Sequence, residues 1–157
     1  MIEKIAGHFG NLTVSRGKKH KFLGMDVEFS ADGKLSLFMK DCIEESIGFF
    51  GEELSANVSS PAKNGLQNIY ESSPIPEKKN ADILHSIVAK ILWVEKVVMP
   101  NIEPDISLLR TRVTNITKEE RAKLRRLFQY LKYTIYDKNI MGEDSLNNFF
   151  TWFNAAY

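Results

Sequence analysis

The stretch KFLGMDVEFSADGKLSLFM, residues 21–39, decides the fold class of the N-terminal part of the chain. Apolar residues recur at every second position in two runs, Leu23 to Phe29 and Leu35 to Met39. A period of two places these side chains on one face of a strand. Between the runs stands Ser30–Gly33, which ends in the Asp-Gly pair that hairpin turns favour. We therefore predict a β-hairpin here.

The hairpin is flanked by predicted helices. A helix is expected from about Asp41 to Phe50, with the Asp41 side chain as the N-cap and Gly51 as the stop. Before the hairpin, residues 1–9 carry apolar side chains at spacings of three and four, as in the last turns of a helix. A chain that begins inside a helix leads us to expect that it was cut from a longer protein.

The second half of the chain has the periodicity of helices. Asn80–Val98 is the most apolar segment, and its broad apolar face predicts burial against at least two neighbours. Pro100 ends it, and Pro104 can open the next helix at its first position. Thr117–Glu120 has the pattern of a capping box, which predicts a helix continuing to about Thr134. The core stripe predicted for this last helix consists of Leu124, Leu127, Phe128 and Leu131.

These elements together predict an α+β protein, with a β-hairpin and a flanking helix followed by a three-helix bundle. The chain divides into an N-terminal lobe at 1–53, a linker at 54–79, a helical lobe at 80–136 and a strand-like segment at 137–157. The linker contains Pro, Ser and Asn without a clear period. The last segment is rich in aromatic residues and has strand character.

The composition sets limits on the class of protein. With 43% hydrophobic and 26% charged residues, the chain is that of a globular protein. Cys42 is the only cysteine, which excludes an internal disulfide and favours an intracellular location, in the cytoplasm or the nucleus. The longest apolar region, 83–99, is interrupted by charged and polar residues, so we expect no membrane span.

The net charge of +1 conceals an uneven distribution. Nine basic and three acidic residues lie between Arg110 and Lys138, whereas Asp41 to Glu53 holds five acids and no base. A nearly neutral chain with a basic C-terminal half is compatible with a one-sided surface for a polyanion.

Several short segments form an informative series along the chain. They are FLGMDV at 22–27, MKDCI at 39–43, VSSPA at 58–62, SIVAKIL at 86–92, PNI at 100–102 and LRRLFQYLKYT at 124–134. Their order and spacing resemble the reverse transcriptase of copia-type retrotransposon polyproteins. The resemblance covers nearly the whole chain, from just beyond the polymerase active site, through the thumb, to the first strand of ribonuclease H.

The resemblance implies a role for the first of these segments. In the family an aromatic-Leu-Gly hairpin forms the primer grip, so Phe22, Leu23 and Gly24 would hold the 3′ end of the primer. Glycine suits a close approach of the backbone to a sugar-phosphate because it has no side chain in the way. The alternative is that Phe22 and Leu23 are ordinary packing residues of the hairpin and that Gly24 marks a bulge.

The chain departs from the family at several positions. Met99 and Asn101 stand around Pro100 where the family has the Arg and Asp of an Arg-Pro-Asp-Ile element, and Tyr133 replaces a usual Gly. Asn154 stands where the ribonuclease H strand has a metal-binding Asp, and an amide is a poorer metal ligand than a carboxylate. These changes would suit a decaying or repurposed copy.

The chain alone is not expected to catalyse polymerisation. The complete polymerase uses Mg²⁺ ions held by aspartates, two of which form a Tyr-x-Asp-Asp hairpin. This sequence contains no Asp-Asp pair, and Tyr136-Asp137 is followed by Lys138 rather than by another acid. We therefore expect the metal site to lie before Met1, in the upstream palm and fingers portion of the polyprotein. We expect no cofactor in this chain.

The predicted last helix carries a row of cations. At about 100° per residue, Lys118, Arg121, Arg125 and Lys132 fall on one stripe beside the apolar face. Such a row could follow the phosphates of a duplex without reading its bases. The alternative is a solvated charged face, partly stabilised by the neighbouring acids Glu119 and Glu120.

Two functional hypotheses follow. In the first, the chain is part of a retrotransposon RNA-directed DNA polymerase and binds a template-primer duplex, either RNA–DNA or DNA, through the hairpin and the thumb. In the second, it is a domesticated or decayed module that serves as a structural or protein-interaction domain. The second predicts that charge reversal at Arg121 and Arg125 has no effect on any nucleic-acid assay.

Overall fold

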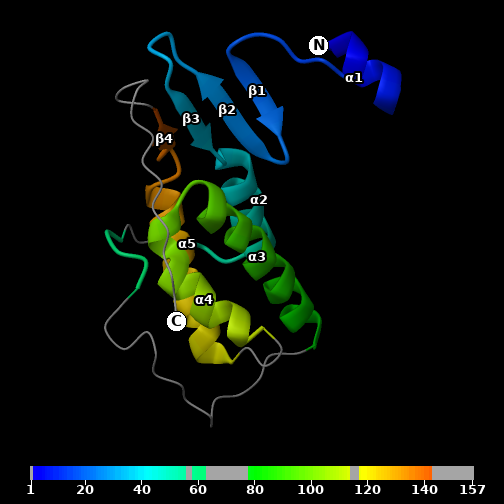
Figure 1. Cartoon of the computed structure of the whole chain (residues 1–157). Coiled ribbons are helices and arrows are strands. Elements are labelled where there is room, and N and C mark those ends of the chain that lie inside the picture. The colour runs from blue at the N-terminus through cyan, green and yellow to red at the C-terminus, as the bar shows by residue number, and fades with distance from the viewer. Residues whose placement is uncertain (1, 56–57, 63–77, 114–116, 143–157) are drawn as a thin grey trace, which may run out of the picture.

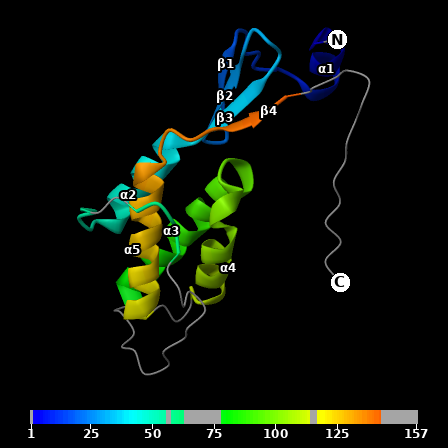
Figure 2. The same ribbon diagram turned by 90° about the vertical axis from the view of Figure 1, so that its left-hand side faces the viewer.

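A computed structural model shows an α+β protein, with a four-stranded antiparallel sheet and one helix followed by a four-helix region (Figure 1). The structure describes residues 2–55, 58–62, 78–113 and 117–142. In both views the sheet lies at one end of the molecule and the helical region at the other (Figures 1 and 2). The predicted α+β class is confirmed.

The sheet has the strand order β1-β2-β3-β4, and each neighbouring pair is antiparallel. The strands are β1 (Lys19–Phe22), β2 (Met25–Phe29), β3 (Leu35–Phe38) and β4 (Asn139–Met141). β2 and β3 form the predicted hairpin, with Val27 opposite Leu37. In the turn between them Gly33 takes a φ of 82°, a conformation that glycine adopts at little cost.

The first predicted strand is wrong at its start, because the chain turns back at Leu23 and Gly24. β1 pairs with β2 as far as the facing residues Phe22 and Met25, so only two residues connect these strands. Both have positive φ angles, 49° for Leu23 and 78° for Gly24, which is the geometry of a two-residue turn that matches the twist of the strands. The sheet therefore begins with two successive hairpins, where the sequence predicted one.

The helices that flank the strands are confirmed as α1 (Ile2–Phe9) and α2 (Lys40–Phe50). α2 ends at Gly51 as predicted, with a left-handed φ of 69°. The predicted N-cap is wrong, since Met39 occupies that position and no side chain caps the helix. The Asp41 carboxylate instead accepts a hydrogen bond from Lys21 Nζ of β1 at 2.6 Å, a partner that lies far away in the sequence.

The helical region contains one helix more than predicted, because α2 belongs to it. Its other members are α3 (Lys78–Val97), the short 3-10 helix η1 (Pro100–Ile102), α4 (Glu103–Thr111) and α5 (Lys118–Tyr133). α2 packs against both α3 and α5. At the second contact, the ring of Phe50 lies 5.1 Å from the ring of Phe128. The expected bundle of three helices is thus a group of four.

The core of the protein lies between these helices. The predicted stripe of α5 is confirmed, since each of its members is at most 1% exposed: Leu124, Leu127, Phe128 and Leu131. The predicted capping box is also present, with the Glu120 carboxylate accepting a hydrogen bond from the backbone N–H of Thr117 at 2.9 Å. α4 begins at Glu103, so Pro104 stands at its second position rather than at the predicted first one, still within the first turn that its fixed φ allows.

β4 returns the chain to the sheet after α5. It pairs with β3, and the side-chain amide of Asn139 donates to the carbonyl oxygen of Val97 at 2.9 Å, which ties the strand to the end of α3. Residues 143–157, including Asn154, lie outside the described residues, as do 63–77 of the predicted linker. Within the described ranges, no helix is long and apolar enough to cross a membrane.

Candidate nucleic-acid interface

The β1–β2 turn presents two large apolar side chains to solvent on a strained backbone. Phe22 is 60% exposed and Leu23 is 66% exposed. Among the described residues, Leu23 is the only one other than glycine with a positive φ. A residue with a Cβ pays about 1–2 kcal/mol for this left-handed conformation. Because strained backbone is often found at binding and catalytic sites, the turn is the first candidate site.

Trp93 of α3 fixes the turn from the helical side. Its indole N–H donates a hydrogen bond to the carbonyl oxygen of Leu23 at 3.1 Å, across 70 residues of sequence. The Trp93 side chain itself is still 39% exposed. Figure 1 shows the β1–β2 turn directed toward the helical region. The turn is therefore attached to a long helix rather than being a free loop.

The cation nearest to the turn in sequence is already paired. Lys21 Nζ lies 2.6 Å from the Asp41 carboxylate and 3.8 Å from that of Asp26. The hydrogen bond with Asp41, together with the charges of both acids, raises the pKa of Lys21 above its ordinary value. Lys21 is thus held positive, but its charge is balanced by Asp26 of β2 and Asp41 of α2. What the turn itself offers a ligand is an apolar surface and exposed backbone.

Two of the four predicted phosphate-binding cations hold a carboxylate of the same chain. Arg121 Nε donates to one oxygen of Glu52 at 2.5 Å, and Arg125 donates to the other oxygen. Burial raises the pKa of the Glu52 carboxyl, but the hydrogen bonds and charges of the two arginines outweigh burial, so the pKa lies below its ordinary value. The Arg121 guanidinium also lies 5.5 Å from the centre of the Phe50 ring. These contacts fasten α5 to the end of α2.

The remaining two cations of the row have different surroundings. Lys132 Nζ donates to the carbonyl oxygen of Leu54 at 3.3 Å, so it faces the same segment after α2 as the two arginines. Lys118 is exposed at the first position of α5. From Lys118 to Lys132 the row extends for about 21 Å at about 1.5 Å per residue. The row and the turn are held by different elements, since α3 anchors the turn and the Glu52–Leu54 segment contacts the row.

Trp93 and Glu52 belong to this interface, but the sequence did not point to either. Trp93 stands in the most apolar helix, where an aromatic residue is expected to be core. Glu52 lies in the acid-rich stretch from Asp41 to Glu53, whose composition contrasts with that of the basic half of the chain. The complementary charges of these two regions were the available signal, yet nothing local specified which acid meets which base.

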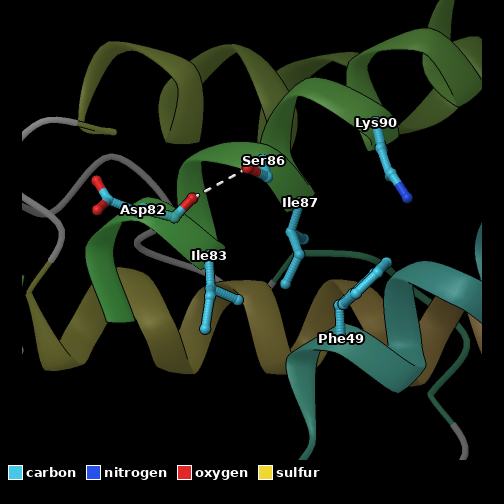
Figure 3. A pocket seen from close by; sticks show the side chains of 6 residues that line it. All are labelled: Phe49, Asp82, Ile83, Ser86, Ile87 and Lys90. Atoms are coloured by element: carbon cyan, nitrogen blue, oxygen red, sulfur yellow. Dashed lines mark hydrogen bonds between the residues drawn. The ribbon is translucent and has the colours of Figure 1, made fainter. Parts of the chain in front are cut away.

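A separate shallow groove lies between α2 and α3 (Figure 3). Its volume is about 320 Å³, and its lining consists of Phe49, Asp82, Ile83, Ser86, Ile87 and Lys90. Lys90 is paired with Glu45 at 2.9 Å and lies 4.6 Å from the centre of the Phe49 ring. The Ser86 hydroxyl donates to the backbone oxygen of Asp82 at 3.1 Å, so it is not activated by a base. Both Lys90 and Ser86 therefore already have partners within the chain.

No group of three or more His, Cys, Asp or Glu side chains suited to hold a metal ion occurs in the described part of the chain. Comparison with known proteins found no match to this chain among protein-family models, curated proteins or solved structures.

Proposed function

We propose that this chain is the primer-gripping palm end and the thumb of a copia-type reverse transcriptase. Its role is to position a template-primer duplex, RNA–DNA or DNA, for an upstream palm that carries the catalytic aspartates and their Mg²⁺. In this proposal strands β1–β3 and α2 form the palm end, and α3, α4 and α5 form the thumb. The chain itself performs no chemical step.

The observation that carries the proposal is the strained and exposed β1–β2 turn. A hairpin built only for stability would place Asn or Gly at the position of Leu23, and would not expose two large apolar side chains there. The space around Gly24 is also open, since a Cβ built on it would meet no atom within 4 Å apart from those of its two chain neighbours. Backbone that a ligand can approach closely, flanked by apolar side chains, suits the sugar and base at the end of a primer.

A second support comes from α4. It packs against both α3 and α5, as the middle helix of a three-helix thumb would. Asp105 is only 3% exposed, and burial raises the pKa of its carboxyl, partly offset by its own backbone N–H and by the charge of Arg126 on α5. Asp105 thus lies where α4 meets α5, inside the proposed thumb.

One observation favours the second candidate, a structural or protein-interaction module. Arg121 and Arg125 already share the Glu52 carboxylate, and this contact alone explains why α5 carries them. Under the polymerase proposal, phosphate must compete with Glu52 for these guanidinium groups. Under the structural alternative, the two arginines only hold the end of α2.

The test is binding of a fluorescently labelled RNA–DNA hybrid with a recessed 3′ end, measured by anisotropy over a series of salt concentrations. We expect affinity to fall steeply with salt, because phosphate contacts release counterions. Phe22→Ala should weaken binding at every salt concentration. Phe49→Ala is the matched control, since Phe49 is exposed to a similar extent, 57% against 60%, but lies on α2 in the separate groove.

Each result separates the two candidates. Binding that is lost in Phe22→Ala and kept in Phe49→Ala supports the polymerase proposal. Failure of the wild-type chain to bind the hybrid at low salt overturns it and leaves the structural alternative. Arg125→Gln tests the row of α5, because loss of a phosphate contact reduces the salt dependence of log K by about one.

A further inference from the structure

Trp93 stands out because it is a half-exposed aromatic residue with one specific long-range bond. The indole N–H donates to the Leu23 carbonyl oxygen at 3.1 Å. That oxygen belongs to the one described residue other than glycine with a left-handed backbone. The bond therefore acts directly on the peptide that determines where the Leu23 side chain points.

We infer that Trp93 is a positioning residue for the primer end. By holding the Leu23 carbonyl oxygen, it keeps the β1–β2 turn in its left-handed form and keeps Phe22 and Leu23 presented to solvent. It also couples the turn to α3, so that the hairpin of the palm end and the first helix of the thumb move as one unit. The inference rests on the proposed function, and it adds a residue that the resemblance does not assign.

The physical reason lies in what the turn lacks without Trp93. Leucine has no intrinsic preference for a positive φ, and its side chain is 66% exposed, so burial contributes little to holding it. Gly24 permits the turn but does not enforce it. A hydrogen bond from a rigid ring on a long helix supplies the missing constraint.

Trp93→Phe tests the inference, because it keeps an aromatic ring and removes the N–H donor. Two labelled RNA–DNA hybrids are compared, one with a recessed 3′ end and one blunt. We expect affinity for the recessed hybrid to fall about three- to tenfold, the range expected from one neutral hydrogen bond. Affinity for the blunt hybrid, which depends on the cations of α5, should stay within about twofold.

Asn139→Ala is the matched control. Asn139 also donates a side-chain hydrogen bond to a backbone oxygen of α3, that of Val97 at 2.9 Å, but at the end of the helix beside β4. It should lower the melting temperature without changing the preference for the recessed end. Melting curves of all variants show whether each one is folded.

The outcomes distinguish this inference from the proposed function. If the wild-type chain binds neither hybrid, both are overturned. If the wild-type chain prefers the recessed hybrid and Trp93→Phe keeps that preference, only the role of Trp93 is overturned. An equal loss for both hybrids also overturns it, since that result indicates a general loss of structure rather than a misplaced turn.

Discussion

The strained turn allows one prediction in which stability and binding change independently. Leu23→Asn and Leu23→Ala both remove the apolar side chain, which is 66% exposed. Only Asn tolerates the left-handed backbone, and Asn-Gly is the pair that two-residue hairpin turns prefer. The two variants should therefore differ in stability and share the same defect in binding.

The magnitudes follow from the exposure and the φ angle. About a third of the Leu23 side chain is covered, so removing it costs at most about 0.5–1 kcal/mol in either variant. In Leu23→Asn alone, relief of the left-handed backbone strain raises the free energy of unfolding by about 1 kcal/mol. We expect Leu23→Asn to be close to wild type and Leu23→Ala to be about 1 kcal/mol less stable, a difference of about 2–4 °C in melting temperature for a chain of this size.

Urea unfolding measures the stabilities, and anisotropy with the recessed hybrid measures binding. Both variants should bind more weakly than wild type by a similar factor. Equal stability of Leu23→Asn and Leu23→Ala would refute the argument from backbone strain. Wild-type affinity in either variant would refute the argument that the Leu23 side chain is kept for binding.

Three other outcomes are expected. Glu52→Gln removes the charge that holds Arg121 and Arg125, so the unfolding free energy should fall by about 1–2 kcal/mol after allowance for solvent screening. Affinity for the hybrid at low salt should rise, because the two arginines become available to phosphate. An unchanged affinity would mean that these arginines contact no phosphate. Folding lowers the pKa of Glu52 below its ordinary value of 4.5. The ionised Glu52 carboxylate therefore stabilises the fold fully at pH values above 4.5, and this stabilisation is lost as the pH falls through the lowered pKa. Urea midpoints at about pH 6 and about pH 3 should therefore differ more for the wild type than for Glu52→Gln. Phe128→Ala leaves a cavity at the α2–α5 contact, where Phe128 is 0% exposed. The free energy of unfolding, measured in the same urea titrations, should fall by about 3–5 kcal/mol. A decrease of less than about 1 kcal/mol would contradict this packing.

The helices of the C-terminal half could be predicted because their signals are local. The stripe of α5 repeats at helical spacing, and its capping box places both partners within four residues. Gly51 ends α2 for the same kind of reason, since only a residue without a Cβ takes the left-handed form freely. In each case neighbours in the sequence are also neighbours in space.

The candidate interface could be predicted only in part. The resemblance points to Phe22, Leu23 and Gly24, but nothing in the sequence places Leu23 and Gly24 at a two-residue turn. The alternation of apolar residues continues through Leu23 into β2, so the sequence reads as one strand. No local preference places leucine in a left-handed turn, and the bond that holds it there comes from Trp93.

The sequence by itself determined the α+β class, the β2–β3 hairpin, the approximate extents of the helices and the buried stripes of α3 and α5. It did not show that the apolar residues of α1, Ile5 and Phe9, stay exposed. The tertiary structure alone decided that α2 joins the helical group, that Glu52 occupies two arginines of α5, and that the first hairpin turns at Leu23. The first set depends on periodicity and on capping residues, which act over one or two turns of the chain. The second depends on contacts between residues about 70 positions apart, which no local pattern encodes.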